Sequence, residues 1–379
     1  MLLRDARRVG SDRRGDVVVA GGRVVAAGGE GPGIDLAGRW LLPGLVNALD
    51  VLDLSVFPPL GTPPFASLYD WGASLEADGG AALRAALAVP LADRLFLGGL
   101  RNLLAGATAV VHHHPYHRSL GRKDFPVRVL SRYQFADSPG RTQALRRTYR
   151  SSDRRIPWLV RAAEGTDDRA RSELDALAAA NVLRQNTVIL HGTGLRPEDG
   201  ARIAAARATV VWCPEADRRL YGTTTPVAAL RAAGVRVGLG SDSPATGSRD
   251  ALSNLAAARR EGVLDDAGLL TLATAESGAV GRLPVGGLEE GSVADLVAVD
   301  DLERFLEGDR RAIALVLVAG RPVYGDPRLM AEAAIGGLEL MVDGSPRRLA
   351  APHAPRLRAL LKTHPVVSEV TWLRGVRIA

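Results

Sequence analysis

The chain has 379 residues, of which 46% are hydrophobic and 24% charged, a globular composition that excludes extensive disorder and allows a large domain plus a smaller one. Lysine and arginine outnumber acidic residues by 48 to 42, which gives a formal charge of +6. The arginines are spread along the chain without interleaved aromatic residues, so a solvated basic surface is favoured and no nucleic-acid partner is expected.

A single cysteine, Cys213, excludes an internal disulfide and a cysteine-based zinc site, which is compatible with a reducing compartment. Charged residues interrupt the first ten positions, at Arg4, Asp5, Arg7 and Arg8. No later stretch reaches the roughly 18 uncharged apolar residues of a membrane span. We therefore expect a soluble, cytoplasmic protein with no membrane partner. The sequence leaves its oligomeric state open, with a homodimer as one alternative.

The first predicted elements are short strands at 16–20 and 23–27, joined by the turn Gly21-Gly22, which is a hairpin signal. Similar strand patterns return at 294–299, 314–318 and 321–324. We predict that the two ends share one small β-domain, built from 1–42 and 285–345, with the hairpin beside the late strands. Residues 346–379 are a C-terminal extension with a helix near 356–362.

Between these ends, residues 43–284 alternate apolar strand-like runs with helical periodicity, which is typical of parallel βα units. The predicted strands are 107–111, 127–130, 158–160, 187–190, 209–212 and 235–239, and the predicted helices include 168–180, 197–206 and 226–233. A doubly wound sheet and a (β/α)8 TIM-like barrel both fit this alternation. The barrel is favoured because polar residues follow the strands, at the rim where barrels hold their sites.

Seven short motifs occur along the chain in a fixed order: LPGLVNA at 42–48, GAT at 106–108, AEG at 163–165, LHG at 190–192, WCP at 212–214, LGSDSP at 239–244 and GSVADLV at 291–297. Together they resemble the amidohydrolase superfamily, in particular its branch that deaminates or dechlorinates heterocycles. The resemblance implies an α/β fold, a (β/α)8 barrel with a small β-sandwich domain formed by the N- and C-terminal segments.

In that family, the first barrel strand carries His-x-His as metal ligands and a later strand carries His-x-x-Glu. Here the first pair falls on Leu49 and Val51, which flank Asp50, and the later histidine falls on Arg161. Leu49 and Val51 offer no donor atom, and a guanidinium has no lone pair for a metal ion. We therefore expect no metal and no other cofactor.

Three residues of the family pattern remain. The resemblance implies that Glu164 shuttles protons, that His191 polarises the substrate or orients water, and that Asp242 is a metal ligand and general base. Without a metal, Arg161 is the only obvious cation to balance the acids of the pocket, so we predict that its guanidinium occupies or borders the vacated metal position and hydrogen-bonds to Asp242, Glu164 or Asp50. It either only neutralises these carboxylates or also holds an anionic or carbonyl group of a ligand.

Other rim residues are candidates for contact with a small-molecule substrate or ligand: Asp50, His112, His114, Tyr116 and, in the aromatic-rich loop 53–71, Trp71. A relocated metal site that uses the histidine run 112–114 with His191 and Asp242 is an open alternative. Cys213 ends an apolar strand and is interpreted as core.

Two functions are compatible with these residues. The first is a hydrolase that acts on a carbon–nitrogen or related bond of a small molecule by metal-independent acid–base catalysis with Glu164, His191, Asp242 and Arg161. The second is a catalytically inactive pseudoenzyme that binds a small ligand or a partner protein at the barrel rim.

Overall fold

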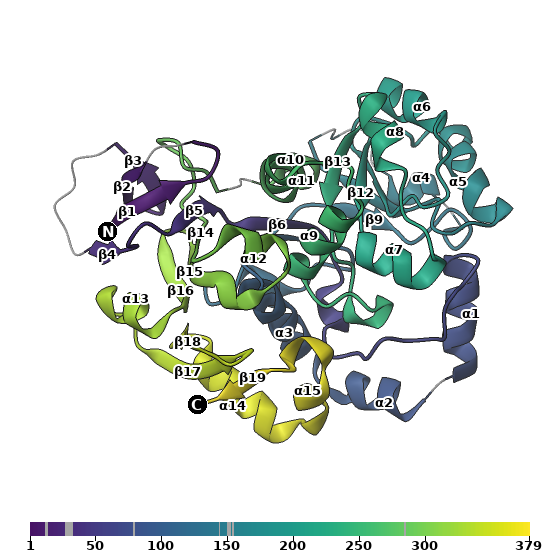
Figure 1. Ribbon diagram of the computed structural model, residues 1–379. Helices are drawn as coiled ribbons and strands as arrows, with labels where there is room; N and C mark the ends of the chain where they lie inside the picture. Colours follow the sequence, from purple (N-terminus) through teal and green to yellow (C-terminus); the bar gives the residue numbers. More distant parts are fainter. Residues whose placement is uncertain are drawn as a thin grey trace.

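The computed structural model describes residues 1–11, 14–26, 33–78, 80–143, 145–149, 153, 155–283 and 286–379. A barrel and a large, mainly antiparallel sheet lie side by side, with the C-terminal segment beneath the sheet (Figure 1). No helix among the described residues combines the length and the apolar character needed to cross a bilayer.

Eight strands form the barrel: β6 (Leu45–Asp50), β7 (Ala107–His112), β8 (Arg128–Val129), β9 (Gln134–Ala136), β10 (Trp158–Arg161), β11 (Thr187–Leu190), β12 (Thr209–Trp212) and β13 (Arg236–Leu239). They pair in parallel as β6-β7-β8 and as β9 to β13. A parallel bridge between Asp50 and Asp242 joins the first strand to the chain after the last. This closure confirms the barrel and rules out the open doubly wound sheet.

Strand β9 was not among the predicted strands because it has only three residues. The other barrel strands agree with the predicted apolar runs, whose small and branched side chains fill the interior. Buried interior residues include Val46, Ala48, Ala109, Val111, Leu159, Val188 and Val211.

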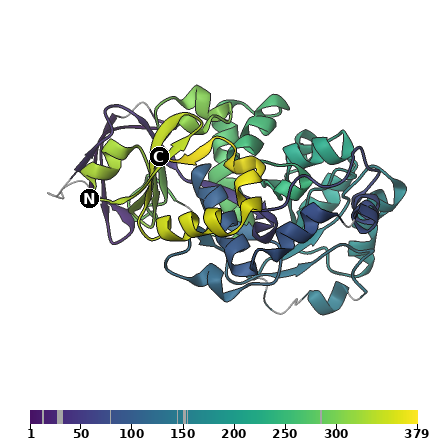
Figure 2. The ribbon, with the colours of Figure 1, turned by 90° about the horizontal axis from the view of Figure 1, so that it is seen from below.

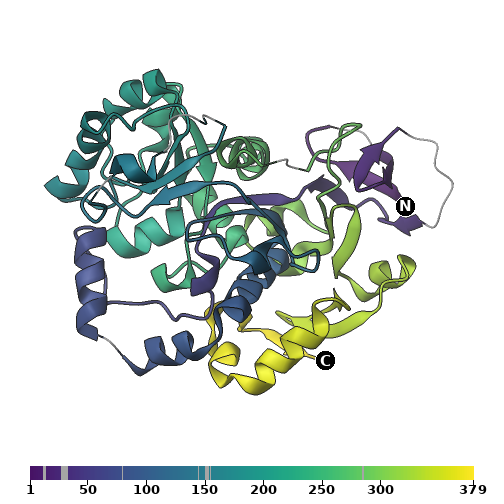
Figure 3. The ribbon, with the colours of Figure 1, turned by 180° about the vertical axis from the view of Figure 1, so that it is seen from behind.

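Helices surround the barrel and connect its strands (Figures 1 and 3). They are α1 (Leu68–Asp78), α2 (Ala81–Ala88), α3 (Leu91–Leu104), α4 (Leu145–Thr148), α5 (Asp168–Ala179), α6 (Asp199–Ala206), α7 (Pro214–Tyr221), α8 (Val227–Ala232), α9 (Ala251–Arg260), α10 (Asp266–Thr271) and α11 (Ser277–Gly281). Asp167, Asp250 and Asp265 cap α5, α9 and α10, because each side chain accepts a hydrogen bond from an N-terminal backbone N–H. The three predicted helices coincide with α5, α6 and α8.

The second sheet contains strands from both chain ends, in the order β19-β17-β18-β16-β15-β14-β5-β1-β2-β3, with β4 beside β1. Its strands are β1 (Leu2–Arg8), β2 (Arg14–Ala20), β3 (Arg23–Val25), β4 (Gly33–Asp35), β5 (Trp40–Pro43), β14 (Leu296–Val299), β15 (Ile313–Val318), β16 (Arg321–Gly325), β17 (Gly337–Val342), β18 (Ser345–Ala350) and β19 (Val376–Ile378). The prediction that both chain ends contribute strands to one sheet is therefore confirmed.

The predicted position of the hairpin within that sheet was wrong in one respect. Within the sheet, strands β1 and β5 separate β2–β3 from β14. The hairpin instead contacts the segment before β14, through a bridge from Arg23 to Val293 and backbone bonds from Val24 N to Ser292 O, from Gly291 N to Val24 O and from Ala294 N to Gly22 O. Strand β1 was not predicted, because only Leu3 and Ala6 of its seven residues are buried. Ala27, the predicted end of the hairpin, lies outside the described residues.

The C-terminal segment contributes to the same sheet and packs beneath it, and both termini lie on the side of the β-domain (Figures 2 and 3). It contains α14 (Ala354–Thr363), where a helix was predicted, and α15 (Pro365–Glu369). Two further helices, α12 (Leu302–Leu306) and α13 (Pro327–Glu332), lie between the late strands. β18 crosses the predicted boundary at 345 and β19 pairs with β17, so the extension is partly sheet. The division into domains stays a prediction, and its boundary at 284–285 falls outside the described residues.

Candidate active site

The barrel brings the four predicted catalytic residues together at the carboxyl ends of its strands. Arg161 is the last residue of β10, His191 follows β11, and Asp242 follows β13. The backbone at His191 and Asp242 has φ of 67° and 55°, in the left-handed region that non-glycine residues rarely adopt. These turns end the strands and place both side chains at the rim.

The guanidinium of Arg161 lies between two carboxylates, as predicted. Its Nη1 donates to Glu164 Oε2 at 2.9 Å and to Oε1 at 3.1 Å, and its Nη2 donates to Asp242 Oδ1 at 2.6 Å. Burial acts to lower the pKa of Arg161, but the charges of Asp242 and Glu164 outweigh it and raise this pKa well above its usual value. The same guanidinium, against the effect of burial, holds the pKa of Asp242 well below its usual range. Both groups therefore stay charged.

His191 lies between Arg161 and a third carboxylate. Its Nδ1 is 2.7 Å from Asp217 Oδ1, and its Nε2 is 3.0 Å from Arg161 Nη1. A guanidinium can only donate, so this second contact is a hydrogen bond only when Nε2 carries no proton. When Nε2 is protonated, it faces Asp242 Oδ2 at 3.6 Å, a buried oxygen with no other hydrogen-bond partner among the described residues.

The surrounding carboxylates raise the pKa of the His191 ring. Burial lowers the pKa of His191, but Glu164, Asp217 and Asp242 more than offset that effect and raise the pKa to about 10. The ring thus takes up a proton readily and has a carboxylate on each side to receive it. This arrangement can hold and transfer a proton within the site.

Sequence reasoning missed two site residues, Asp217 and Tyr221, which lie one turn apart on α7. Asp217 accepts from His191 and from Thr225 Oγ1 at 3.1 Å, and burial raises the pKa of Asp217. The Tyr221 hydroxyl donates to Glu164 Oε1 at 2.9 Å. Their signal was the i, i+4 spacing on the helix that directly follows a barrel strand, which places both side chains on one face.

Asp50, the third alternative partner predicted for Arg161, has a different cation. It pairs with Arg101 Nη2 at 2.6 Å and accepts from Asn102 Nδ2 at 2.7 Å, both on α3, and the Asp50 and Arg101 side chains are fully buried. The register of β6 shifts between Asn47 and Asp50, and in this stretch Leu49 packs in the barrel interior while Asp50 points outward to the helix. Arg161 is therefore not the only buried cation near these acids, and Asp50 holds β6 to α3.

The three histidines of the run 112–114 after β7 contact different partners. His112 is buried with its Nδ1 3.3 Å from Asp50 O, and burial lowers the pKa of His112 to about 4. His113 Nε2 is 3.0 Å from Ala136 O, His114 Nδ1 is 2.9 Å from Asp53 Oδ1, and Tyr116 is exposed. No group of three or more His, Cys, Asp or Glu side chains among the described residues is arranged to hold a metal ion. The relocated metal site thus finds no support in the described residues.

The segment from Leu60 to Trp71 covers the site. Leu68 N donates to Glu164 O at 3.0 Å, Thr166 N donates to Ala66 O at 2.7 Å, and Ser67 forms a bridge with Gly165. Trp71 packs with Phe65, Leu68, Leu220 and Tyr221. Glu164, His191 and Asp242 are at most 1% exposed and Arg161 is 7% exposed, so the site is closed to solvent in this structure.

Cys213 lies in the barrel core, as predicted. It is buried, and burial raises its pKa well above the usual value. A thiol in that state is a poor nucleophile.

Comparisons with known proteins bear on the family and the fold. A model of the amidohydrolase family matches residues 158–323. The chain is 30% identical over 143 residues to a 5-methylthioadenosine/S-adenosylhomocysteine deaminase of Haloquadratum walsbyi, which covers 35% of this chain and 32% of that protein. It is 41% identical over 66 residues to an aminodeoxyfutalosine deaminase of Deinococcus radiodurans, 17% of this chain and 16% of that protein. The chain spans about a third, or less, of the length of these curated relatives.

Solved structures share the fold over most of the chain. An adenosine deaminase from Xanthomonas campestris with bound zinc superposes with a TM-score of 0.65 at 19% identity, covering 81% of this chain and 87% of that one. Atrazine chlorohydrolase from Arthrobacter aurescens TC1, complexed with zinc, gives a TM-score of 0.67 at 17% identity, covering 88% and 98%.

The described residues do not fit such a zinc ion. A catalytic zinc site takes about three protein ligands and an open position for water. Here Leu49 and Val51 are apolar and buried, and the Arg161 guanidinium already occupies the space between Glu164, Asp242 and His191. A second cation at this point would be repelled by the first, and the arginine would have to leave.

Proposed function

From the premise that this chain is a member of the amidohydrolase superfamily, we propose that it hydrolyses a carbon–nitrogen or related bond of a small molecule, cyclic ones included, without a metal. The observation that carries the proposal is Arg161, whose guanidinium contacts Glu164, His191 and Asp242 together. The residues that handle protons in this family are kept, and a fixed cation stands among them. Such a cation stabilises negative charge without a metal ion.

The chemistry is the addition of water to a carbon that bears nitrogen, followed by loss of that nitrogen as an amine or ammonia. Glu164 and His191 exchange protons, one taking a proton from the water and the other giving one to the leaving nitrogen. Asp242 holds Arg161 in place and offers its Oδ2 to the water or the substrate.

Arg161 has donors left for a ligand. Its Nη1 binds Glu164 and lies 3.0 Å from His191 Nε2, and its Nη2 binds Asp242, whereas its Nε–H has no acceptor among the described residues. Arg161 is also the most exposed of the four groups. A carbonyl oxygen or an oxyanion of the substrate can therefore bind to the guanidinium once the covering segment 60–71 moves.

One observation favours a second function, binding without turnover. Arg161 already forms ion pairs with both carboxylates, and the site is closed in this state. A relative that binds a small ligand or partner protein without turnover needs no more than that. The relatives' own names nevertheless support turnover, since both are deaminases.

A turnover screen separates the two. Release of ammonia or amine is measured with cyclic amides, amidines and aminoheterocycles, including 5-methylthioadenosine and S-adenosylhomocysteine, before and after chelation. Turnover that survives chelation and is lost in Glu164→Gln, but not in the exposed control Glu198→Gln, supports the hydrolase. Turnover lost on chelation and restored by zinc refutes the metal-free mechanism, and saturable binding without any turnover supports the binding protein.

A further inference from the structure

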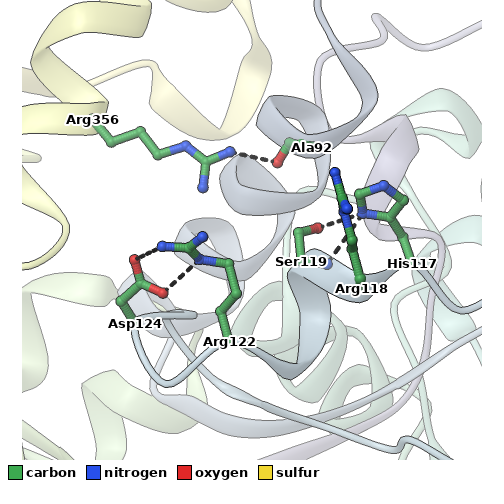
Figure 4. A pocket seen from close by; sticks show the side chains of 7 residues that line it. All are labelled: Ala92, His117, Arg118, Ser119, Arg122, Asp124 and Arg356. Carbon is green, nitrogen blue, oxygen red and sulfur yellow. Dashed lines mark hydrogen bonds and ion pairs between the residues drawn. The ribbon is translucent and has the colours of Figure 1, made fainter.

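A cavity of about 630 Å³ lies away from the barrel site, between the connection from β7 to β8, the first turn of α3 and the C-terminal helix α14. Figure 4 shows the side chains that line it: Ala92, His117, Arg118, Ser119, Arg122, Asp124 and Arg356. Three of them carry guanidinium groups and one carries a carboxylate. Its volume is in the range of about 300 to 1,000 Å³ that is usual for small-molecule sites.

Two of the guanidinium groups are paired with carboxylates, and each leaves one nitrogen free. Arg122 binds Asp124 through Nε at 2.8 Å and Nη2 at 3.0 Å. Arg356 binds Asp93 through Nε at 3.0 Å and Nη2 at 2.7 Å, and it lies over the ring of Phe96. In both arginines the Nη1 group has no acceptor among the residues that the structure describes. The two groups face each other across the cavity (Figure 4).

The third guanidinium, that of Arg118, has no ion pair among the described residues and stands beside His117 on the opposite wall (Figure 4). The Asp124 and Asp93 carboxylates balance Arg122 and Arg356, so the excess positive charge of the cavity is that of Arg118. The hydrogen bonds of Asp124 with Arg122 lower the pKa of Asp124, and Arg356 acts in the same direction, so this carboxylate is charged and already paired. Three guanidinium groups thus converge on one space with an excess of positive charge.

We propose that this cavity binds a small anion whose phosphate or carboxylate oxygens accept hydrogen bonds from Arg122, Arg356 and Arg118. Phosphate and carboxylate groups share the forked acceptor geometry that guanidinium groups match. Arg356 is pre-organised by its ion pair with Asp93 and its contact with Phe96, so little entropy of this side chain is lost on binding. None of the lining residues belongs to the barrel site, and the proposal is independent of any catalytic function.

The test is isothermal titration of the full chain at low ionic strength, with inorganic pyrophosphate and citrate as probes. We expect at least one probe to bind, with affinity that falls as NaCl is added. Arg118→Gln should weaken binding by about tenfold or more, without loss of thermal stability, because this side chain makes no ion pair in the described chain. Arg356→Gln should weaken it too, whereas Arg171→Gln, an exposed arginine on α5, should not.

Two results would overturn the proposal. One is the absence of binding of either probe up to about 10 mM. The other is binding that Arg118→Gln and Arg356→Gln leave unchanged, which would place the anion elsewhere. If Arg356→Gln unfolds because α14 loses its contact with α3, the Arg118→Gln result alone decides. The preference between pyrophosphate and citrate tells a phosphate ligand from a carboxylate ligand.

Discussion

Arg161 Nη2 lies 2.6 Å from Asp242 Oδ1, and this ion pair joins the end of the fifth barrel strand to the chain after the eighth. The Asp242 side chain is fully buried and that of Arg161 is 9% exposed. A buried ion pair of this kind adds little net stability, but removing one partner leaves the other charge buried and unpaired. In this site, Arg161 has two such partners.

Replacing Arg161 by alanine should therefore destabilise the protein by about 3 to 5 kcal/mol, measured by urea unfolding at neutral pH. Glu164 and Asp242 would both lose their cation. The matched control is Arg171→Ala, whose partner Asp168 is fully exposed, and it should cost about 0 to 1 kcal/mol. Equal effects of the two substitutions would contradict the buried pairing.

The stability should also depend on pH through His191. Its pKa is raised to about 10 in the folded protein, against about 6.5 in an unfolded chain. A raised pKa stabilises the folded state fully below pH 6.5, and this contribution is lost as the pH rises from there through about 10. The difference in unfolding free energy between the wild type and His191→Gln should thus shrink between pH 7 and 10.

Other groups that titrate in this window are common to both proteins, so the difference isolates the ring. A difference that stays constant across the window would show that His191 keeps the same protonation state in the folded and unfolded chains. In that case the ring would be neutral in the folded protein, and the carboxylates would stabilise it only through its hydrogen bond with Asp217.

The shared sheet predicts that the N-terminal segment is needed for folding. Strand β5 lies between β1 and β14, with Leu41 opposite Ala298 and Leu42 opposite Val297. Deleting residues 1–42 would expose the edge of β14, whose four residues are all buried. We expect an insoluble product or one without a cooperative thermal transition.

The matched control for that deletion is removal of 376–379, which takes away the edge strand β19. Two of its three residues are exposed, so the truncated chain should melt cooperatively with a small loss of stability. A soluble, cooperative chain without residues 1–42 would contradict the role of the composite sheet.

The sequence was most informative where one residue replaced another in a known pattern. Arg161 stood out because it fills the histidine position of His-x-x-Glu, and its predicted contacts with Glu164 and Asp242 are present. Arg101 gave no such signal, since an arginine on an amphipathic helix is ordinarily solvated. Its burial against Asp50 follows from the packing of α3 on the barrel, which no local pattern encodes.

The same limit applies to short elements and to helix-borne partners. Continuous apolar runs such as 187–190 predicted their strands, because a parallel strand that is buried on both faces has a continuous hydrophobic sequence. The three residues of β9 are too few to show a period. Asp217 and Tyr221 act through a helix whose orientation is known only once the barrel has closed.

The sharpest test of the site restores the family's metal ligands. The purified wild-type protein should carry well under one equivalent of zinc, iron or manganese by elemental analysis, since the donors of His191 and Asp242 alone cannot complete a site. The triple change Leu49→His, Val51→His and Arg161→His supplies three imidazoles and removes the cation at the same rim. Because Leu49 faces the barrel interior and His191 and Asp242 already converge there, this variant should bind about one equivalent of zinc. Arg161→His alone serves as the control and should bind little, because positions 49 and 51 still lack donors. Zinc bound equally by both variants, or by neither, would show that the first strand does not present these positions to Asp242 and would overturn the proposed roles of Arg161 and Asp242.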